Sequence, residues 1–151
     1  MKIHYTLKKF DELTLDELYQ LMRLRQEVFV VEQNCPYLDA DGKDKHGYHV
    51  LGKDEHGILQ CCTRLLPEGI SFEGYASIGR VANSQSVRGK GEGKKLMIFS
   101  LIQIKQLYSG AEIKIGAQEY LKSFYENLGF EDVNHAYLED GIPHLIMVLK
   151  K

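Results

Sequence analysis

The sequence predicts an α/β protein with a central mixed, mostly antiparallel sheet and flanking helices. Short apolar runs rich in β-formers alternate with segments of helical periodicity. One strand-like run ends near Asn83, a glycine-rich loop and a long apolar helix follow it, and another strand-like run comes next. Strands joined by such a helical crossover should be parallel, with a right-handed connection. Short glycine-containing links between the other runs predict antiparallel hairpins.

Length and composition fit one domain that spans residues 1–151. A chain of 151 residues is long enough to bury a sizeable core. The formal charge of −2 gives no reason to expect nucleic acid or an anionic membrane as a partner. No apolar run is long enough to span a membrane and no signal-peptide pattern opens the sequence, so we expect a cytoplasmic protein.

The cysteines predict reduced thiols rather than a disulfide or a metal site. Cys35, Cys61 and Cys62 are odd in number, two of them are adjacent, and none has zinc-type spacing to a histidine. Cys61 and Cys62 should pack on opposite faces of a strand, because successive side chains alternate. We expect no metal ion.

The first third of the chain predicts a strand, a helix and a polar connection. Ile3, Tyr5 and Leu7 alternate with polar residues, as in a half-buried strand. Thr14 and Glu17 match a capping box at the start of a helix from about 14 to 31. Residues 34–45 are polar, and the glycine spacing fails the calcium-loop pattern, so a solvated turn is expected.

The middle of the chain predicts a three-stranded meander followed by a long helix. Tyr48–Lys53 and Ile58–Leu66 should form a hairpin, and Phe72–Asn83 should be the third strand. The helix from about Lys90 to Tyr108 is apolar on more than one face, which suits burial against a sheet.

The last third predicts a strand, a short helix and a second hairpin. Glu112–Gly116 should be a strand, and a helix over about Gln118–Leu128 should stop at Gly129, a left-handed C-cap. Phe130–Leu138 and Ile142–Leu149 should pair around a turn. These C-terminal strands could also add to the sheet of a second copy and form a homodimer.

The segment from Arg88 to Lys94 is predicted to bind phosphate. Its glycines let backbone N–H groups approach an anion, and the following helix presents its positive end. A Walker A loop is excluded because Lys95 replaces the Ser or Thr, and a dinucleotide fingerprint is excluded because Lys94 replaces its third glycine. The remaining pattern, Arg88-Gly89-Lys90-Gly91-Glu92-Gly93, resembles the acyl-CoA pyrophosphate loop of the GNAT N-acetyltransferases.

The resemblance extends to the order of the elements and to a second motif. The predicted order is that of the GNAT fold, in which the strand carrying Val81 splays from its parallel neighbour near Gly116 and pantetheine fills the gap. Phe124 to Phe130 resembles a family motif whose tyrosine, here Tyr125, is the general acid for the departing thiolate. A helix tyrosine that merely packs on the sheet is the structural alternative.

Some positions depart from the family pattern. Asn83 stands where an apolar residue is usual, and Ala117 replaces a common asparagine whose role Gln118 could take. The acetyl-CoA contacts that the resemblance implies are Val81, Ala82, Asn83, Arg88, Gly89, Lys90, Gly91, Glu92, Gly93, Lys94 and Gln118.

The run from Arg25 to Tyr37 and the acidic loop after it resemble the ElaA-like branch of the family. In GNAT folds this region forms the acceptor-side wall. The resulting candidates to bind or deprotonate an amine are Glu32, Gln33, Asp41, Asp44 and His49. His49, with an ordinary pKa near ~6.5, could be the base or a packed, hydrogen-bonded histidine. Arg64 and Arg80 could neutralise an acidic acceptor or pair with the acidic loop.

The sequence therefore favours an acetyl-CoA-dependent N-acetyltransferase that moves the acetyl group directly to a primary amine. Its acceptor could be a small polyamine, an amino sugar or a peptide. The alternative is a CoA-sensing or protein-binding module that keeps the fold with little transfer. A kinase that binds ATP through the glycine-rich loop is a weaker third hypothesis, because the Ser or Thr for Mg²⁺ is missing.

Overall fold

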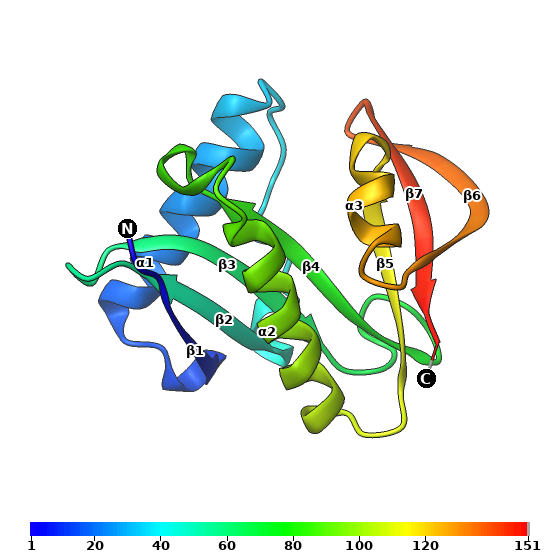
Figure 1. The fold of residues 1–151 in the computed structure, drawn as a ribbon, viewed down its shortest axis with the longest axis horizontal. Helices are drawn as coiled ribbons and strands as arrows, with labels where there is room; N and C mark the ends of the chain where they lie inside the picture. Colours follow the sequence, from blue (N-terminus) through cyan, green and yellow to red (C-terminus); the bar gives the residue numbers. More distant parts are fainter. Residues whose placement is uncertain (151) are drawn as a thin grey trace.

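A computed structural model describes residues 1–150, which form one seven-stranded sheet in the order β1-β2-β3-β4-β5-β7-β6 (Figure 1). Its strands are β1 (His4–Lys9), β2 (Tyr48–Lys53), β3 (Leu59–Leu66), β4 (Tyr75–Asn83), β5 (Glu112–Gln118), β6 (Glu131–Glu139) and β7 (Ile142–Leu149). The pair β4 and β5 is parallel and the other neighbouring pairs are antiparallel. The predicted fold class is confirmed.

The helices connect and cover these strands. They are α1 (Leu15–Arg25), the π-helix η2 (Gln26–Glu32), α2 (Glu92–Leu107) and α3 (Lys122–Glu126). Short 3-10 turns complete the set: η1 (Phe10–Glu12), η3 (Asp44–His46), η4 (Gln85–Val87) and η5 (Glu119–Leu121). Among the described residues no helix is both long and apolar enough to span a membrane.

Several predicted boundaries differ from those observed. The helix expected over 14–31 changes from α to π at Gln26, a distinction that a helical period does not reveal. The strand expected from Phe72 begins at Tyr75, because a turn at Gly74 (φ 82°) leaves Phe72 in an isolated bridge. Gln118 ends β5 instead of opening a helix, so α3 is shorter than expected.

The two apolar layers lie on opposite faces of the sheet. Leu96 and Met97 of α2 pack with Cys61 on one face, whereas Leu21 of α1 packs with Cys62 on the other, as Figure 1 shows for the helices. All three cysteines are free and buried. The second apolar face of α2 remains uncovered, since Ile98 and Ile102 are 43% and 51% exposed.

The feature that positions the cleft is the divergence of β4 from β5. These strands pair only at Tyr75 with Glu112 and at Ala76 with Ile113, and they then separate (Figure 1). The cause is a bulge: Cys62 pairs with Ala82 and Arg64 with Gly79, so two β4 residues oppose one β3 residue. The splay that the family resemblance implies is confirmed.

Glu17 ties the first helix to the first two strands. The predicted capping box is confirmed, since Glu17 N–H donates to Thr14 Oγ1 and Thr14 N–H donates to Glu17 Oε1, each at 3.0 Å. Lys8 and Lys53 each place Nζ 2.7 Å from the buried carboxylate of Glu17. Burial alone would raise the pKa of Glu17, but the hydrogen bonds from Lys53, Lys8 and Thr14 outweigh it and lower the pKa to about 2.

We predict that Glu17 makes the stability of the protein vary with pH in the acidic range. Because the folded-state pKa is about 2 and the ordinary value is 4.5, the contribution of Glu17 is complete above pH 4.5 and is lost as pH falls toward 2. Glu17→Gln should lower the free energy of unfolding at neutral pH by on the order of 2 kcal/mol. It should also make the decline between pH 4.5 and 2 shallower.

Urea denaturation across this pH range measures both effects. Glu27→Gln is the matched control, because Glu27 is half exposed and pairs only with Arg23, four residues earlier on the helix. Parallel curves for Glu17→Gln and the parent would show that the pKa of Glu17 is not lowered in the folded protein.

Candidate functional site

A cleft of about 1280 Å³ lies where β4 and β5 diverge. Its walls come from η2, β4, the loop before α2, β5, α3 and the β6–β7 hairpin. Residues from both predicted halves of the site line it. They are Val81, Asn83, Arg88, Gly89, Gly93, Gln118 and Tyr125 on the predicted donor side, with Glu32, Gln33, Asp41, Arg64 and Arg80 on the predicted acceptor side.

The glycine-rich loop presents unused backbone donors at the start of α2. Gly89 and Gly91 have left-handed backbones (φ 74° and 79°), and Gly91 is the N-cap of α2. The backbone N–H groups from Gly89 to Lys94 have no hydrogen-bond acceptor among residues 1–150. Six free donors at the positive end of a sixteen-residue helix are an arrangement that can bind an anion.

The side chains of this loop contribute less than predicted. The carboxylate of Glu92 is turned toward β1, where the Tyr5 hydroxyl donates to it at 2.6 Å, so this side chain does not face the cleft. Lys90 donates to the Ser86 carbonyl, and Lys90, Gly91 and Lys94 do not line the cleft. Their predicted contact with a ligand is therefore limited to their backbones.

Arg88 joins the loop to the end of η2. Its Nε donates to the Asn83 carbonyl at 2.9 Å, and its second terminal nitrogen donates to Glu32 Oε1 at 2.6 Å. Glu32 was predicted as an acceptor-side residue, but its carboxylate is engaged with the donor-side loop. The pair therefore connects the two halves of the cleft.

The end of β4 carries a buried polar atom with no partner. Asn83 Oδ1 is buried and accepts no hydrogen bond within the described part of the chain. Asn83 and Val81 line the cleft, whereas Ala82 points to the opposite side and packs with Cys62. The predicted ligand contact of Ala82 therefore concerns its backbone, while Asn83 offers a side-chain acceptor to a ligand N–H group.

Tyr125 is held rigidly on the wall of the cleft. Its ring meets Phe124 and Phe130 edge to face, with centroids 5.2 and 5.9 Å apart. Gly129 (φ 101°) turns the chain so that Phe130 N–H donates to the Tyr125 carbonyl. Burial raises the pKa of Tyr125 to about 12, so its phenol is neutral at physiological pH. Among residues 1–150 its hydroxyl has no hydrogen-bond partner, which leaves it available to a ligand.

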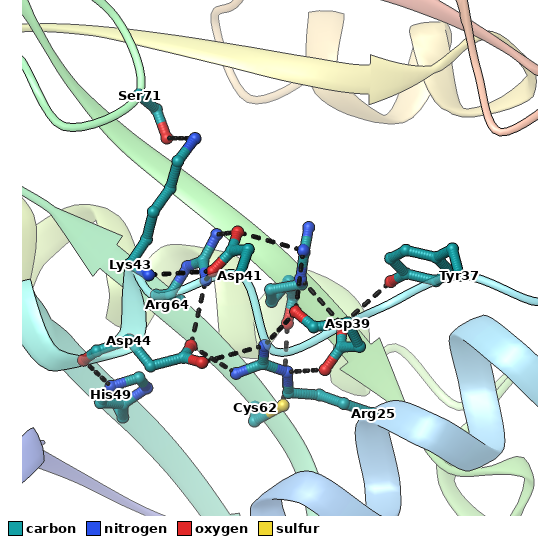
Figure 2. A network of polar contacts seen from close by, with 11 residues as sticks. Arg25, Tyr37, Asp39, Asp41, Lys43, Asp44, His49, Cys62, Arg64 and Ser71 are labelled. Atoms are coloured by element: carbon teal, nitrogen blue, oxygen red, sulfur yellow. Dashed lines mark hydrogen bonds and ion pairs between the residues drawn. The ribbon is translucent and has the colours of Figure 1, made fainter.

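Three arginines and three aspartates fix the acidic connection after η2 (Figure 2). Arg25, fully buried at the end of α1, lies 2.7 Å from both Asp39 and Asp44. Asp44 also contacts Arg64 at 3.0 Å. We call Arg25, Asp39, Asp41, Asp44, Arg64 and Arg80 the arginine–aspartate network.

The network shows which groups Arg64 and Arg80 contact. Arg64 lies 2.8 Å from Asp41, and Arg80 lies 2.8 Å from Asp39 and 3.2 Å from Asp41. Both arginines therefore pair with the acidic loop, which is one of the two alternatives that the sequence left open. Asp44 is buried and does not line the cleft, so its predicted position on the acceptor wall is wrong.

His49 is a packed core histidine. It is 1% exposed, its Nε2 lies 2.9 Å from the Asp44 carbonyl, and it does not line the cleft. Burial lowers the pKa of His49, so the ring is kept neutral. The geometry supports the packed, hydrogen-bonded alternative and not the role of base.

The C-terminal hairpin places three further side chains in the cleft that the sequence did not indicate. Tyr137, Glu139 and His144 line the cleft. The hydroxyl of Tyr137 lies where the Cβ of a larger residue at Gly116 would be, so such a residue would displace the Tyr137 side chain. The signal in the sequence was His144 itself, a polar side chain within the otherwise apolar run of β7. Among residues 1–150, no group of three or more His, Cys, Asp and Glu side chains could hold a metal ion.

Comparisons with known proteins were made against family models, curated sequences and solved structures. The acetyltransferase (GNAT) domain model matches residues 45–151. Protein ElaA of Escherichia coli K12 is 42% identical over 140 residues, which is 90% of this chain and 89% of that protein. Its crystal structure superposes with a TM-score of 0.91 at 36% identity and covers 99% of this chain and 100% of that one.

Two further structures extend the comparison. An acyl-CoA N-acyltransferase from Pseudomonas aeruginosa has a TM-score of 0.91 at 40% identity, with 98% of this chain and 99% of that one covered. A GNAT family acetyltransferase from Elizabethkingia anophelis with acetyl-CoA bound has a TM-score of 0.67 at 14% identity, covering 99% of this chain and 98% of that one. The latter likeness concerns the fold alone.

We predict that Arg25 is essential for the stability of the acidic loop. Arg25→Met keeps the length of the side chain but leaves Asp39 and Asp44 buried with fewer positive partners, which should cost about 3 kcal/mol. Arg23→Met is the matched control, because Arg23 is 71% exposed and its pair with Glu27 should contribute less than ~0.5 kcal/mol. Urea denaturation gives both values, and equal losses for the two variants would contradict the assigned role of Arg25.

Proposed function

Because the chain belongs to the GNAT acetyltransferase family, in its ElaA-like branch, we propose that it transfers an acetyl group from acetyl-CoA directly to a primary amine. The observation that carries the proposal is the continuous cleft between the free donors of the loop at Gly89–Lys94 and the wall at η2. A donor and an acceptor that enter from opposite ends could meet where β4 leaves β5.

The loop before α2 suits the pyrophosphate of CoA. Free N–H groups and the helix dipole favour a diffuse negative charge, and the absence of side chains at Gly89, Gly91 and Gly93 lets phosphate oxygens reach the backbone. Arg88 would add a formal charge beside them. Its ion pair with Glu32 is partly exposed, so exchanging part of that contact for a phosphate would cost little.

The diverging strands suit the pantetheine arm. Beyond Ala76 and Ile113, β4 and β5 no longer pair, which leaves backbone groups on their facing edges for the amides of the arm. Asn83 Oδ1, buried and without a partner among residues 1–150, would accept one further N–H. A protein of the same fold from Elizabethkingia anophelis binds acetyl-CoA, and this supports acetyl-CoA as the donor here.

Tyr125 would protonate the departing sulfur. When a neutral amine attacks the thioester carbonyl, the C–N bond forms, the C–S bond breaks, and the thiolate takes the proton of the phenol. A thiol in water has a pKa of ~8.5, well below that of a buried phenol. Burial has a large effect on thiols in this protein, since it raises the pKa of Cys61 and Cys62 to about 12. If the sulfur of CoA is enclosed in the same way beside Tyr125, its pKa would approach that of the Tyr125 phenol.

The alternative function, a CoA-sensing or protein-binding module, shares the donor half of this site. This alternative predicts that the protein binds CoA and acetyl-CoA but does not transfer the acetyl group to an amine. The free hydroxyl of Tyr125 on the cleft wall favours transfer, because a sensor has no need of a rigid phenol that lacks a structural hydrogen bond.

We predict that Tyr125→Phe separates catalysis from binding. Loss of the general acid should lower kcat by about 10²- to 10⁴-fold, while the Kd for acetyl-CoA stays within about twofold of the parent. Thiol release from acetyl-CoA with spermidine, glucosamine and glycylglycine as acceptors measures kcat, and calorimetry measures Kd. Tyr19→Phe, on the exposed face of α1, is the control. Unchanged turnover would remove Tyr125 from the mechanism, and CoA binding by the parent without any transfer would favour the sensing module.

We also predict that charge reversal in the glycine-rich loop weakens the binding of CoA. Arg88→Glu places a carboxylate beside the pyrophosphate and beside Glu32, and it removes a charged donor, so Kd should rise about 10- to 100-fold. Lys105→Glu makes the same change of charge at the far, exposed end of α2 and should leave Kd within about twofold. Equal affinities of the Arg88→Glu variant and the parent, measured by calorimetry, would refute the phosphate site.

A further inference from the structure

His144 and Glu139 form a titratable pair on the cleft wall that the donor half of the site does not use. His144 Nε2 lies 3.3 Å from Glu139 Oε2, and the two side chains are 8% and 55% exposed. His144 Nδ1 lies 2.8 Å from the Ile142 carbonyl. A carbonyl oxygen only accepts hydrogen bonds, so Nδ1 carries a hydrogen and the lone pair of a neutral ring is on Nε2.

The ring is held in place from two sides. The centroids of Tyr137 and His144 are 5.4 Å apart, and the Tyr137 hydroxyl occupies the space above Gly116. The Ile142 carbonyl holds the opposite part of the imidazole. An imidazole with a fixed tautomer and a fixed orientation is the arrangement that a general base requires.

The sheet places His144 and Tyr125 on opposite faces of the same opening. Ala117 of β5 and Leu145 of β7 pack in the apolar cluster that contains Tyr125. Their neighbours Gln118 and His144 pair with each other across β5 and β7 and point to the other face, because side chains alternate along a strand. Tyr125 and His144 nevertheless line the same cleft, since it passes between the diverging strands.

Resting on the proposed function, we propose that His144 is the general base for the acceptor amine and that Glu139 binds the ammonium form of that amine at the mouth of the cleft. Nε2 of His144 first takes one proton from the bound ammonium and passes it to water past Glu139, which leaves the neutral amine that attacks the thioester carbonyl. As the C–N bond forms and the C–S bond breaks, the nitrogen gives a second proton to Nε2 of His144, and Tyr125, on the other face, gives one proton to the sulfur. The imidazolium then returns its proton to water and the phenol regains one from water, so of the two protons that the nitrogen loses one is balanced by the new thiol and one is released.

A purely structural role does not account for the contact between His144 and Glu139. Glu139 is more than half exposed, and ion pairs of this kind contribute little to stability, so the hairpin does not need the contact. The acceptor wall at η2 provides no competing base within the described residues. There, Glu32 is paired with Arg88, and Asp41 is paired with Arg64 and Arg80.

The pH dependence of kcat distinguishes a base from a structural residue. Tyr137 and Glu139 of β6 lie beside His144, and its β5 partner Gln118 is neutral. His144→Gln should abolish the ascending limb of the kcat profile and lower kcat by about 10²- to 10⁴-fold. Glu139→Gln removes the charge that binds the ammonium, so it should raise the KM of spermidine about 3- to 10-fold and leave kcat within about twofold.

The experiment measures kcat between pH 5.5 and 9 with spermidine, glucosamine, glycylglycine and hydroxylamine as acceptors. Hydroxylamine is largely unprotonated at neutral pH and needs no binding step at Glu139, so His144→Gln should slow its acetylation by less than about tenfold. The Kd for acetyl-CoA should stay within about twofold in both variants. Thermal unfolding tests whether His144→Gln folds, and Glu139→Gln, an exposed substitution, gives the change in KM even if His144→Gln does not fold.

The outcomes separate the two proposals. Loss of the limb in His144→Gln, or a raised KM in Glu139→Gln, supports the assignment. A pH profile of His144→Gln and a KM of Glu139→Gln that both equal those of the parent overturn the assignment and leave the acetyltransferase function standing. A parent protein that binds acetyl-CoA but acetylates none of the four acceptors overturns the proposed function and the assignment together.

Discussion

The buried charge of Arg25 is the constraint on which the architecture of the cleft depends. It lies at the point where α1 becomes the π-helix η2, and it holds Asp39 and Asp44 at 2.7 Å. The connection after η2 has little regular structure of its own, so these ion pairs fix its path across the sheet. A buried charge that loses its partner is costly, and each aspartate in turn orients a second arginine, Arg64 or Arg80.

Arg80 links this network to the opening between the strands. Its backbone is left-handed (φ 49°), a conformation that costs a non-glycine residue roughly 1–3 kcal/mol and persists only where its surroundings impose it. The contacts of its side chain with Asp39 and Asp41 stabilise that conformation. The bulge at Arg80 turns β4 away from β5, so the charges of the arginine–aspartate network also help to open the cleft between these strands.

Features set by neighbours in the chain could be predicted from the sequence, and features set by distant partners could not. The capping box at Thr14, the glycine loop at Gly91 and the left-handed turn at Gly129 follow from local backbone chemistry. The partners of Arg25 lie fourteen and nineteen residues away, and no spacing rule connects them. The same limit explains why the sequence indicates His49 as a possible base and does not indicate His144, whose place in the cleft depends on the pairing of β5, β6 and β7.

The most direct test of the acetyl-CoA cleft is a crystal structure with CoA bound. The account predicts that the pyrophosphate lies on the N–H groups of Gly89 to Lys94, and that the sulfur lies within about 3.5 Å of the Tyr125 hydroxyl. The arm between them should follow the facing edges of β4 and β5. Density for CoA outside the opening between these strands, or a sulfur on the side away from Tyr125, would contradict it.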